Sequence, residues 1–205
     1  MSQSTGVASA LVLAYLMSVA GASAQGVRVQ VGAGGSLTFP MSFYRATPSG
    51  DGFTTALQGV ALVDFKRPDA PVGLRVDVTT GHNSANDSLK QHLTTLVGAP
   101  TDAKVSLLGG NVDVTYNFQR ASAVRGYLLG GIGLYGVKYA VTSSGSTADT
   151  SATKFAWNVG AGLTVGTGAV KAFLEMRYLD VAAFETIKPT ALSTTAGIRL
   201  GIGGT

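Results

Sequence analysis

Charged residues are scarce in this chain of 205 residues, and several of them recur at alternate positions within apolar stretches. All charged residues together make up 13% of the sequence. Arg75 and Asp77 are two residues apart, and Glu175 and Arg177 share this spacing. In an extended strand, this spacing places both side chains on one face, where opposite charges can pair. The residues on this polar face balance four bases against four acids: Arg28, Arg75, Arg177 and Arg199 against Asp64, Asp77, Asp113 and Glu175.

Two histidines are the other residues with a chemistry of their own. His82 and His92 lie in a stretch that also holds Ser84, Ser88 and Asp87, so a nucleophile and a base are close in sequence. The chain contains no GxSxG elbow and no other ordered triad pattern. It also has no Cys, which excludes a disulfide and a thiolate ligand, and two His support no zinc site. We therefore predict no catalytic residue, no metal site and no cofactor.

The composition excludes several classes of protein. Hydrophobic residues make up 45% of the chain and the net charge is only +4, whereas a disordered chain needs few apolar residues and a high net charge. The pI near 9.4 would suit a nucleic-acid partner, but Lys and Arg are spread along the chain and form no basic run. The sequence therefore indicates a folded protein in a nonpolar environment, without a nucleic-acid partner.

The first residues have the pattern of an export signal. Residues 7–22 are almost entirely apolar, and the Ala22-Ser23-Ala24 sequence that overlaps their end matches an A-x-A cleavage site. The apolar run is shorter than the ~20 residues that a transmembrane helix needs. We therefore expect residues 1–24 to be a cleaved signal peptide and residues 25–205 to form the mature domain, although the leading MSQSTG lacks the usual Lys or Arg.

After this segment, apolar residues recur with a period of two. Val112, Val114, Tyr116 and Phe118, for example, alternate with polar residues, as expected for a strand with one apolar face. Eight such segments are separated alternately by short connections and by long ones, the latter over residues 40–52, 80–104, 142–153 and 180–190. This order predicts an all-β, up-and-down antiparallel sheet, which closes into an eight-stranded barrel to pair its edges. Ten strands are the alternative. Within the second long loop, residues 86–97 have helical spacing behind a cap at Asn86 or Asp87, and residues 142–153 are expected to form a flexible, solvated loop.

Composition also predicts which face of the barrel meets lipid. The outer face of a soluble barrel carries many Lys and Glu, whereas here even the polar face is mainly Gly, Thr, Ser and Asn. We therefore expect the apolar face to point outward into a membrane and the charged residues to line the interior. Aromatic residues near both strand ends are expected to form the two interfacial girdles of a membrane barrel: Phe65, Tyr116, Phe118 and Tyr127 beside the short turns, and Phe39, Tyr139, Phe155, Trp157 and Tyr178 toward the long loops.

Three stretches of the chain resemble the OmpA-like and OmpX-like outer-membrane β-barrel family. They are Val72-Gly-Leu-Arg-Val-Asp77, residues 154–163, and residues 173–178 together with residues 195–200. The resemblance implies a barrel in the Gram-negative outer membrane, with both termini in the periplasm and the long loops outside. It also implies an interior network of Glu and Arg, matched here by Glu175, Arg177 and Arg199. The family usually ends its last strand with an aromatic residue that the assembly machinery is thought to read, and Leu200 stands at that position.

We expect a non-enzymatic protein, with a structural role or a surface interaction through its loops. Eight strands enclose a lumen that side chains can fill. The expected partners are outer-membrane lipid, the assembly machinery and an extracellular ligand of the loops, and the protein is expected to be a monomer. A narrow channel for small apolar solutes is the first alternative, since Gly110, Gly130, Gly131, Gly133, Gly160 and Gly162 would leave room inside. An outer-leaflet lipid-modifying enzyme that uses His82 and His92 is the second.

Overall fold

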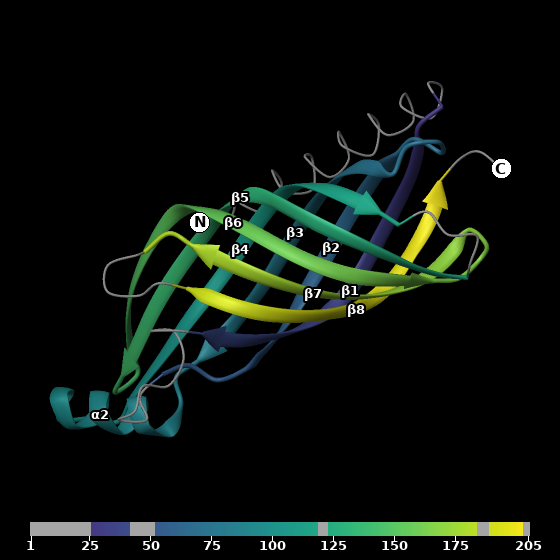
Figure 1. Ribbon diagram of the computed structural model, residues 1–205. Helices are drawn as coiled ribbons and strands as arrows, with labels where there is room; N and C mark the ends of the chain where they lie inside the picture. The colour runs from purple at the N-terminus through teal and green to yellow at the C-terminus, as the bar shows by residue number, and fades with distance from the viewer. Residues whose placement is uncertain (1–25, 42–51, 119–122, 184–188, 203–205) are drawn as a thin grey trace.

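The protein is an eight-stranded antiparallel β-barrel in the computed structural model (Figure 1). The structure describes residues 26–41, 52–118, 123–183 and 189–202, so the predicted signal peptide lies outside the described residues. The strands are β1 (Arg28–Met41), β2 (Ala56–Lys66), β3 (Val72–Ser84), β4 (Thr101–Asn117), β5 (Val124–Ser143), β6 (Ser146–Val165), β7 (Val170–Val181) and β8 (Thr190–Ile202), with helix α2 (Asp87–Val97) between β3 and β4.

Each strand pairs with its neighbours in sequence, and β1 pairs antiparallel with β8 to close the barrel. The closing register runs from Val29 opposite Ile202 to Met41 opposite Thr190. Closure leaves no strand with an unpaired edge, which is a requirement in hydrocarbon because no water is present there to satisfy backbone groups. The prediction of an eight-stranded up-and-down barrel is confirmed.

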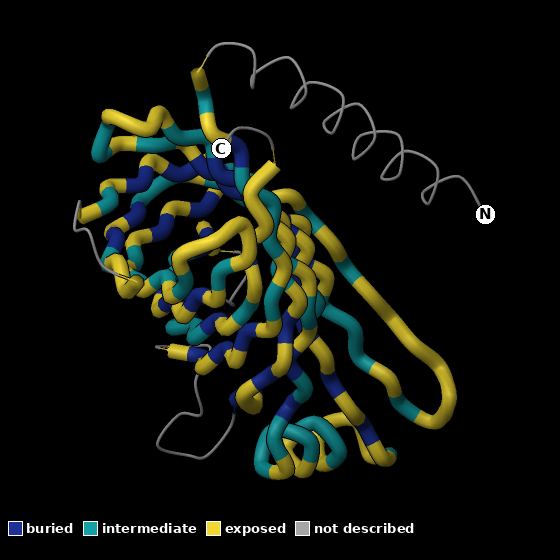
Figure 2. The backbone as a smooth tube through the Cα atoms, turned by 90° about the vertical axis from the view of Figure 1, so that its right-hand side faces the viewer, coloured by how far each residue is buried: buried dark blue, intermediate teal, exposed yellow. Residues whose placement is uncertain are grey.

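Alternation along the strands sorts the side chains into an outer and an inner set. Ile132 and Leu134 of β5 face outward and are 57% and 62% exposed, whereas the intervening odd-numbered positions of that strand face inward. Figure 2 shows the same alternation of buried and exposed positions along the strands. The wall is therefore apolar outside, and the buried charged residues are inside.

The two ends of the barrel differ. The β2–β3 and β6–β7 connections span only residues 67–71 and 166–169, and they lie at the end where β1 begins and β8 finishes (Figure 1). We call this the short-turn end. Helix α2 lies beyond the opposite end, which we call the loop end. No described helix is both long and apolar enough to cross a bilayer.

The predicted flexible loop over residues 142–153 is wrong. Strands β5 and β6 continue as a hairpin to a two-residue turn at Ser144 and Gly145, which have φ angles of 49° and 83°. Positive φ at both central residues is the geometry of the tight hairpin turn that suits strand twist, and glycine adopts it without strain. The Thr-rich flanks favour strands, and the hydroxyls of Thr142 and Thr147 are 2.9 Å apart across the hairpin.

The predicted helix over residues 86–97 is present as α2. The side chain of Asn86 accepts a hydrogen bond from the backbone N–H of Leu89, and Gly98 ends the helix in the left-handed conformation. Strand β3, however, extends to Ser84, so His82 lies on a strand and not in the predicted loop.

Candidate functional site: the interior of the barrel

Glu175 of β7 connects most of the interior charges. Its Oε1 accepts hydrogen bonds from Arg177 Nε and Nη2 at 3.2 and 2.9 Å. Its Oε2 accepts from the Tyr127 hydroxyl at 2.7 Å and from Arg75 Nη1. Glu175, Arg75 and Arg177 are all buried, so their charges interact in a medium of low dielectric constant, where pairing counts most.

Asp64 joins two of the arginines near the short-turn end. Arg75 Nε donates to Asp64 Oδ1 at 2.7 Å, and Arg199 Nη1 lies 3.3 Å from Asp64 Oδ2. The Tyr127 hydroxyl accepts a hydrogen bond from Arg199 Nη2 at 2.6 Å. The Arg199 guanidinium also stacks 4.8 Å from the ring centre of Tyr127 and 4.5 Å from that of Phe173, which are favourable cation–π distances.

Arg177 links the same cluster to the carboxylates of β3 and β4. Its Nη1 lies 2.8 Å from Asp77 Oδ2, and its Nη2 lies 3.3 Å from Asp113 Oδ2. Two amides complete the arrangement: Asn111 donates to Asp77 at 2.8 Å, and Asn158 donates to Asp113 at 2.8 Å. We call the whole set the lumen network; its members are Asp64, Arg75, Asp77, Asn111, Asp113, Tyr127, Asn158, Glu175, Arg177 and Arg199.

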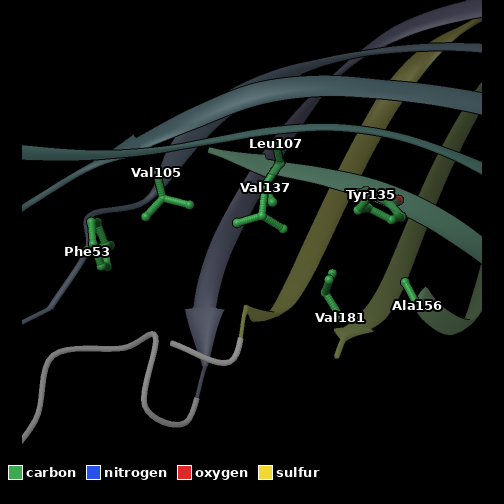
Figure 3. Packing of buried hydrophobic residues seen from close by; sticks show 7 residues of the cluster. All are labelled: Phe53, Val105, Leu107, Tyr135, Val137, Ala156 and Val181. Carbon is green, nitrogen blue, oxygen red and sulfur yellow. The ribbon is translucent and has the colours of Figure 1, made fainter. Parts of the chain in front are cut away.

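A second layer of the interior is apolar and lies toward the loop end. Figure 3 shows that its side chains come from several strands and from the segment before β2. We call this layer the interior apolar cluster; it consists of Phe53, Val105, Leu107, Tyr135, Val137, Ala156 and Val181. The Tyr135 hydroxyl accepts a hydrogen bond from Asn111, which joins the cluster to the lumen network. The interior is therefore occupied by an ionic layer and by an apolar one.

The interior glycines are covered by side chains from neighbouring strands. Gly162 lies under the ring of Tyr127, and Gly131 lies against the carboxylate of Asp113. Gly110 and Gly130, which we expected in the interior, are on the outer face. The small residues therefore accommodate large polar partners and do not widen the lumen.

Three of the predicted site residues lie elsewhere than expected. Tyr127 and Tyr139 were assigned to the girdles but face inward: Tyr127 belongs to the lumen network, and Tyr139 contacts Phe53 edge to face at 6.4 Å. Both parities of β5 are apolar, so sequence alone does not show which side faces lipid. Arg28 points inward from β1 but is exposed at the short-turn end, outside the lumen network.

The other predicted aromatic residues face outward in two groups. Tyr116 and Phe118 contact each other edge to face at 5.5 Å near the short-turn end, where Phe65 also lies. Toward the loop end, Trp157 and Tyr178 are 5.4 Å apart between ring centres, and Phe39 and Phe155 are also exposed there. This distribution fits the headgroup regions of a bilayer.

The histidines are not part of the interior. His82 faces outward from β3, opposite Ser106 of β4. His92 is exposed on α2. Within the described residues, no group of three or more His, Cys, Asp or Glu is arranged to hold a metal ion.

Sequence reasoning missed the neutral partners of the charges. Asn111 donates to Asp77, Asn158 donates to Asp113, and the Tyr127 hydroxyl donates to Glu175, in addition to the arginines that pair with these carboxylates. The alternation of Asn111 with Val112 and Val114 placed this residue on the polar face of its strand. Nothing in the sequence identified its hydrogen-bond partner.

Comparison with known proteins agrees with this architecture. Residues 9–199 match the model of the outer membrane protein beta-barrel domain. The chain belongs to this family. It is accordingly an integral protein of the bacterial outer membrane.

Solved structures show the same fold. Neisserial surface protein A is 21% identical, with 85% of this chain and 96% of that chain covered and a TM-score of 0.53. A major outer membrane protein from Thermus thermophilus is 8% identical, with 85% and 99% covered and a TM-score of 0.57. No curated protein sequence matches the chain significantly.

Proposed function

We propose that this protein is a closed, non-conducting barrel that acts at the cell surface through its loop end. The observation that carries the proposal is the double filling of the lumen by the lumen network and the interior apolar cluster. Eight-stranded barrels have an interior only wide enough for side chains to fill, and here two successive layers of side chains occupy it. The filled interior provides a rigid framework that supports the loop end.

The loop end carries the features suited to contact with a partner. Helix α2 projects beyond the strands and exposes Leu96 and Val97, which are 72% and 54% exposed. Strands β5 and β6, at 20 residues each, are longer than the 9–11 residues needed to cross the hydrocarbon. Outer-membrane barrels have short turns in the periplasm and longer loops outside, which supports an extracellular position for α2 and this hairpin.

Conductance measurements test the closed state. Purified protein inserted into a planar bilayer is expected to show no ion current, and liposomes containing it are expected not to swell in small apolar or polar solutes. Glu175→Ala removes the charge at the centre of the lumen network, and its ion current is compared with that of the wild-type protein. Stable unitary conductance of the wild-type protein would contradict the proposal in favour of the channel.

Cysteine labelling tests the orientation, because the natural chain has no Cys. Leu96→Cys places a thiol on α2, and Arg67→Cys places one in the exposed β2–β3 turn. A membrane-impermeant maleimide is expected to label Leu96→Cys on intact cells and Arg67→Cys only after the outer membrane is opened. The reverse pattern would show that α2 faces the periplasm and would overturn the surface role.

A further inference from the structure

The short-turn end of the barrel has a strongly cationic opening. A cavity of about 110 Å³ opens there, and the described residues of its lining include seven Arg and Lys residues but only one carboxylate, Asp64. Five of these cations surround the opening and form what we call the basic rim: Arg28, Lys66, Arg67, Arg125 and Lys171. Arg75 and Arg199 lie deeper in the same cavity.

Cations that line this cavity are direct cross-strand partners with like charge. Arg28 of β1 is opposite Lys66 of β2, and Lys171 of β7 is opposite Arg199 of β8. Lys66 also interacts electrostatically with Arg125 and Lys171. Like charges placed directly opposite one another destabilise a sheet, so these pairs lower the stability of the barrel when no anion is bound between them.

The single carboxylate of the cavity does not neutralise the rim. Asp64 already accepts Arg75 Nε at 2.7 Å and lies 3.3 Å from Arg199 Nη1. Its charge is therefore shared by the two deep arginines. Among the described lining residues, positive charge is therefore in excess at a concave opening with a low-dielectric wall, a shape that concentrates anions.

A buried donor without a partner lies in the same cavity. Arg199 is 4% exposed, and its Nη1 and Nη2 atoms contact Asp64 and Tyr127, but its Nε has no hydrogen-bond partner among the described residues. Leaving such a donor unsatisfied is costly, so the Arg199 guanidinium keeps unmet hydrogen-bonding capacity at the wall of the cavity. Thr115, Asn117 and Thr164 add neutral polar groups to the lining.

We propose that the short-turn opening is a binding site for a phosphate-class oxyanion, held between Lys66 and Lys171 of the basic rim with Arg199 at its base. Guanidinium and ammonium groups bind phosphate oxygens through charge-assisted hydrogen bonds. The cavity volume suits a single small oxyanion group. That group comes either from free inorganic phosphate or from the headgroup of an anionic phospholipid.

Calorimetric titration of inorganic phosphate into the full-length barrel in nonionic detergent tests the site. One phosphate per barrel is expected to bind, and Lys66→Ala and Lys171→Ala are each expected to weaken the affinity about tenfold. The matched control is Lys104→Ala with Lys138→Ala, which removes two exposed lysines of the outer face. This control is expected to leave phosphate affinity unchanged.

Thermal unfolding separates loss of the site from loss of the fold. Combining Lys66→Ala with Lys171→Ala removes repulsion across the rim, so the phosphate-free variant is expected to unfold at the same or a higher temperature than the wild type. Phosphate is expected to raise the unfolding temperature of the wild type only. Absence of phosphate binding by the wild type, or equal binding by this variant, would overturn the site.

Vesicles distinguish the two sources of the anion. The barrel is placed in phosphatidylcholine vesicles made anionic to the same extent by phosphatidylglycerol or by oleate. Weaker binding of inorganic phosphate in the phosphatidylglycerol vesicles alone would identify the lipid headgroup as the occupant, because headgroup and free phosphate then compete. Equal binding in both would identify the free anion. The proposal does not depend on the loop end, so its failure would leave the surface role intact.

Discussion

At the scale of single residues, the interior is organised around Glu175, which contacts two arginines and a tyrosine through its two oxygens. A buried charge is tolerated only when it is paired and hydrogen-bonded, so each partner of Glu175 depends on it. The lumen network contains three arginines and four carboxylates, and its amides and tyrosine supply the additional donors.

Substitution of Glu175 by Ala is expected to lower the free energy of unfolding by ~3 to 5 kcal/mol, because it leaves buried arginines without their shared carboxylate. Urea unfolding in detergent micelles measures this change. Asp149→Ala is the control, since it breaks a pair with Lys138 in which both side chains are about half exposed and is expected to cost less than ~1 kcal/mol. Similar losses for both variants would contradict the lumen network as a source of stability.

Gly162 provides a second prediction at this scale. A methyl group there would collide with the Tyr127 ring and approach the backbone oxygen of Leu174 at 2.8 Å, so Gly162→Ala is expected to destabilise the barrel by ~1 to 3 kcal/mol. Gly130→Ala on the outer face meets only an ordinary contact at 3.6 Å and is expected to be neutral. Unfolding midpoints of the two variants give the comparison, and equal effects would argue against Tyr127 filling the interior.

Charged positions were predictable because alternation with apolar residues assigns them to one face, as for Arg75 between Leu74 and Val76. Tyr127 and Tyr139 were not predictable, because tyrosine suits both a membrane interface and a hydrogen-bonded interior. The inward position of Tyr127 is favoured by the Glu175 carboxylate and the Arg199 guanidinium, which come from β7 and β8.

At the scale of elements, the strands were predictable from period two, but their ends were not. The β5–β6 hairpin shows why. Residues 142–153 contain no large apolar residue, so no alternation of apolar and polar residues marks them as strands. Their pairing depends on hydrogen bonds between polar strands. Helix α2, by contrast, was predictable because its spacing and its cap are both local signals.

The cap of α2 yields a prediction of its own. Asn86→Ala removes the acceptor for the Leu89 N–H and is expected to destabilise the helix by ~1 kcal/mol. Hydrogen exchange of the α2 amides is expected to quicken several-fold while exchange in the strands stays unchanged. Gln91→Ala, at an exposed position inside the helix, is the control and is expected not to quicken exchange. Slower or unchanged exchange in Asn86→Ala would contradict the role of the cap.

At the scale of the whole molecule, the apolar outer wall and the filled interior follow from one alternation repeated around a closed sheet. The single Trp of the chain reports on this arrangement, since Trp157 is 44% exposed on the outer face beside Tyr178. Fluorescence of Trp157 is expected to be quenched by brominated lipids, more by bromine near the headgroups than by bromine at the chain ends. Lack of quenching at any depth would place Trp157 away from lipid.

Closure of the barrel predicts its behaviour on gels. Unboiled protein folded in detergent is expected to migrate differently from boiled protein, because a sheet without edges resists detergent until it is heated. In a chain truncated before β8, the edges of β1 and β7 that normally pair with β8 are unpaired. This truncated chain is expected to migrate identically with and without boiling. Identical migration of the full-length protein with and without boiling would contradict a closed barrel.

The pairing of β1 with β8 joins the first and the last strand of the barrel. The contact between Gly35 and Ala196 joins segments about 160 residues apart along the chain, so its high contact order makes the final seam the slowest to form. Until β8 pairs with it, β1 has an unpaired edge that can form hydrogen bonds with other chains. We therefore expect the chain to be most prone to pairing with other chains before β8 closes the sheet.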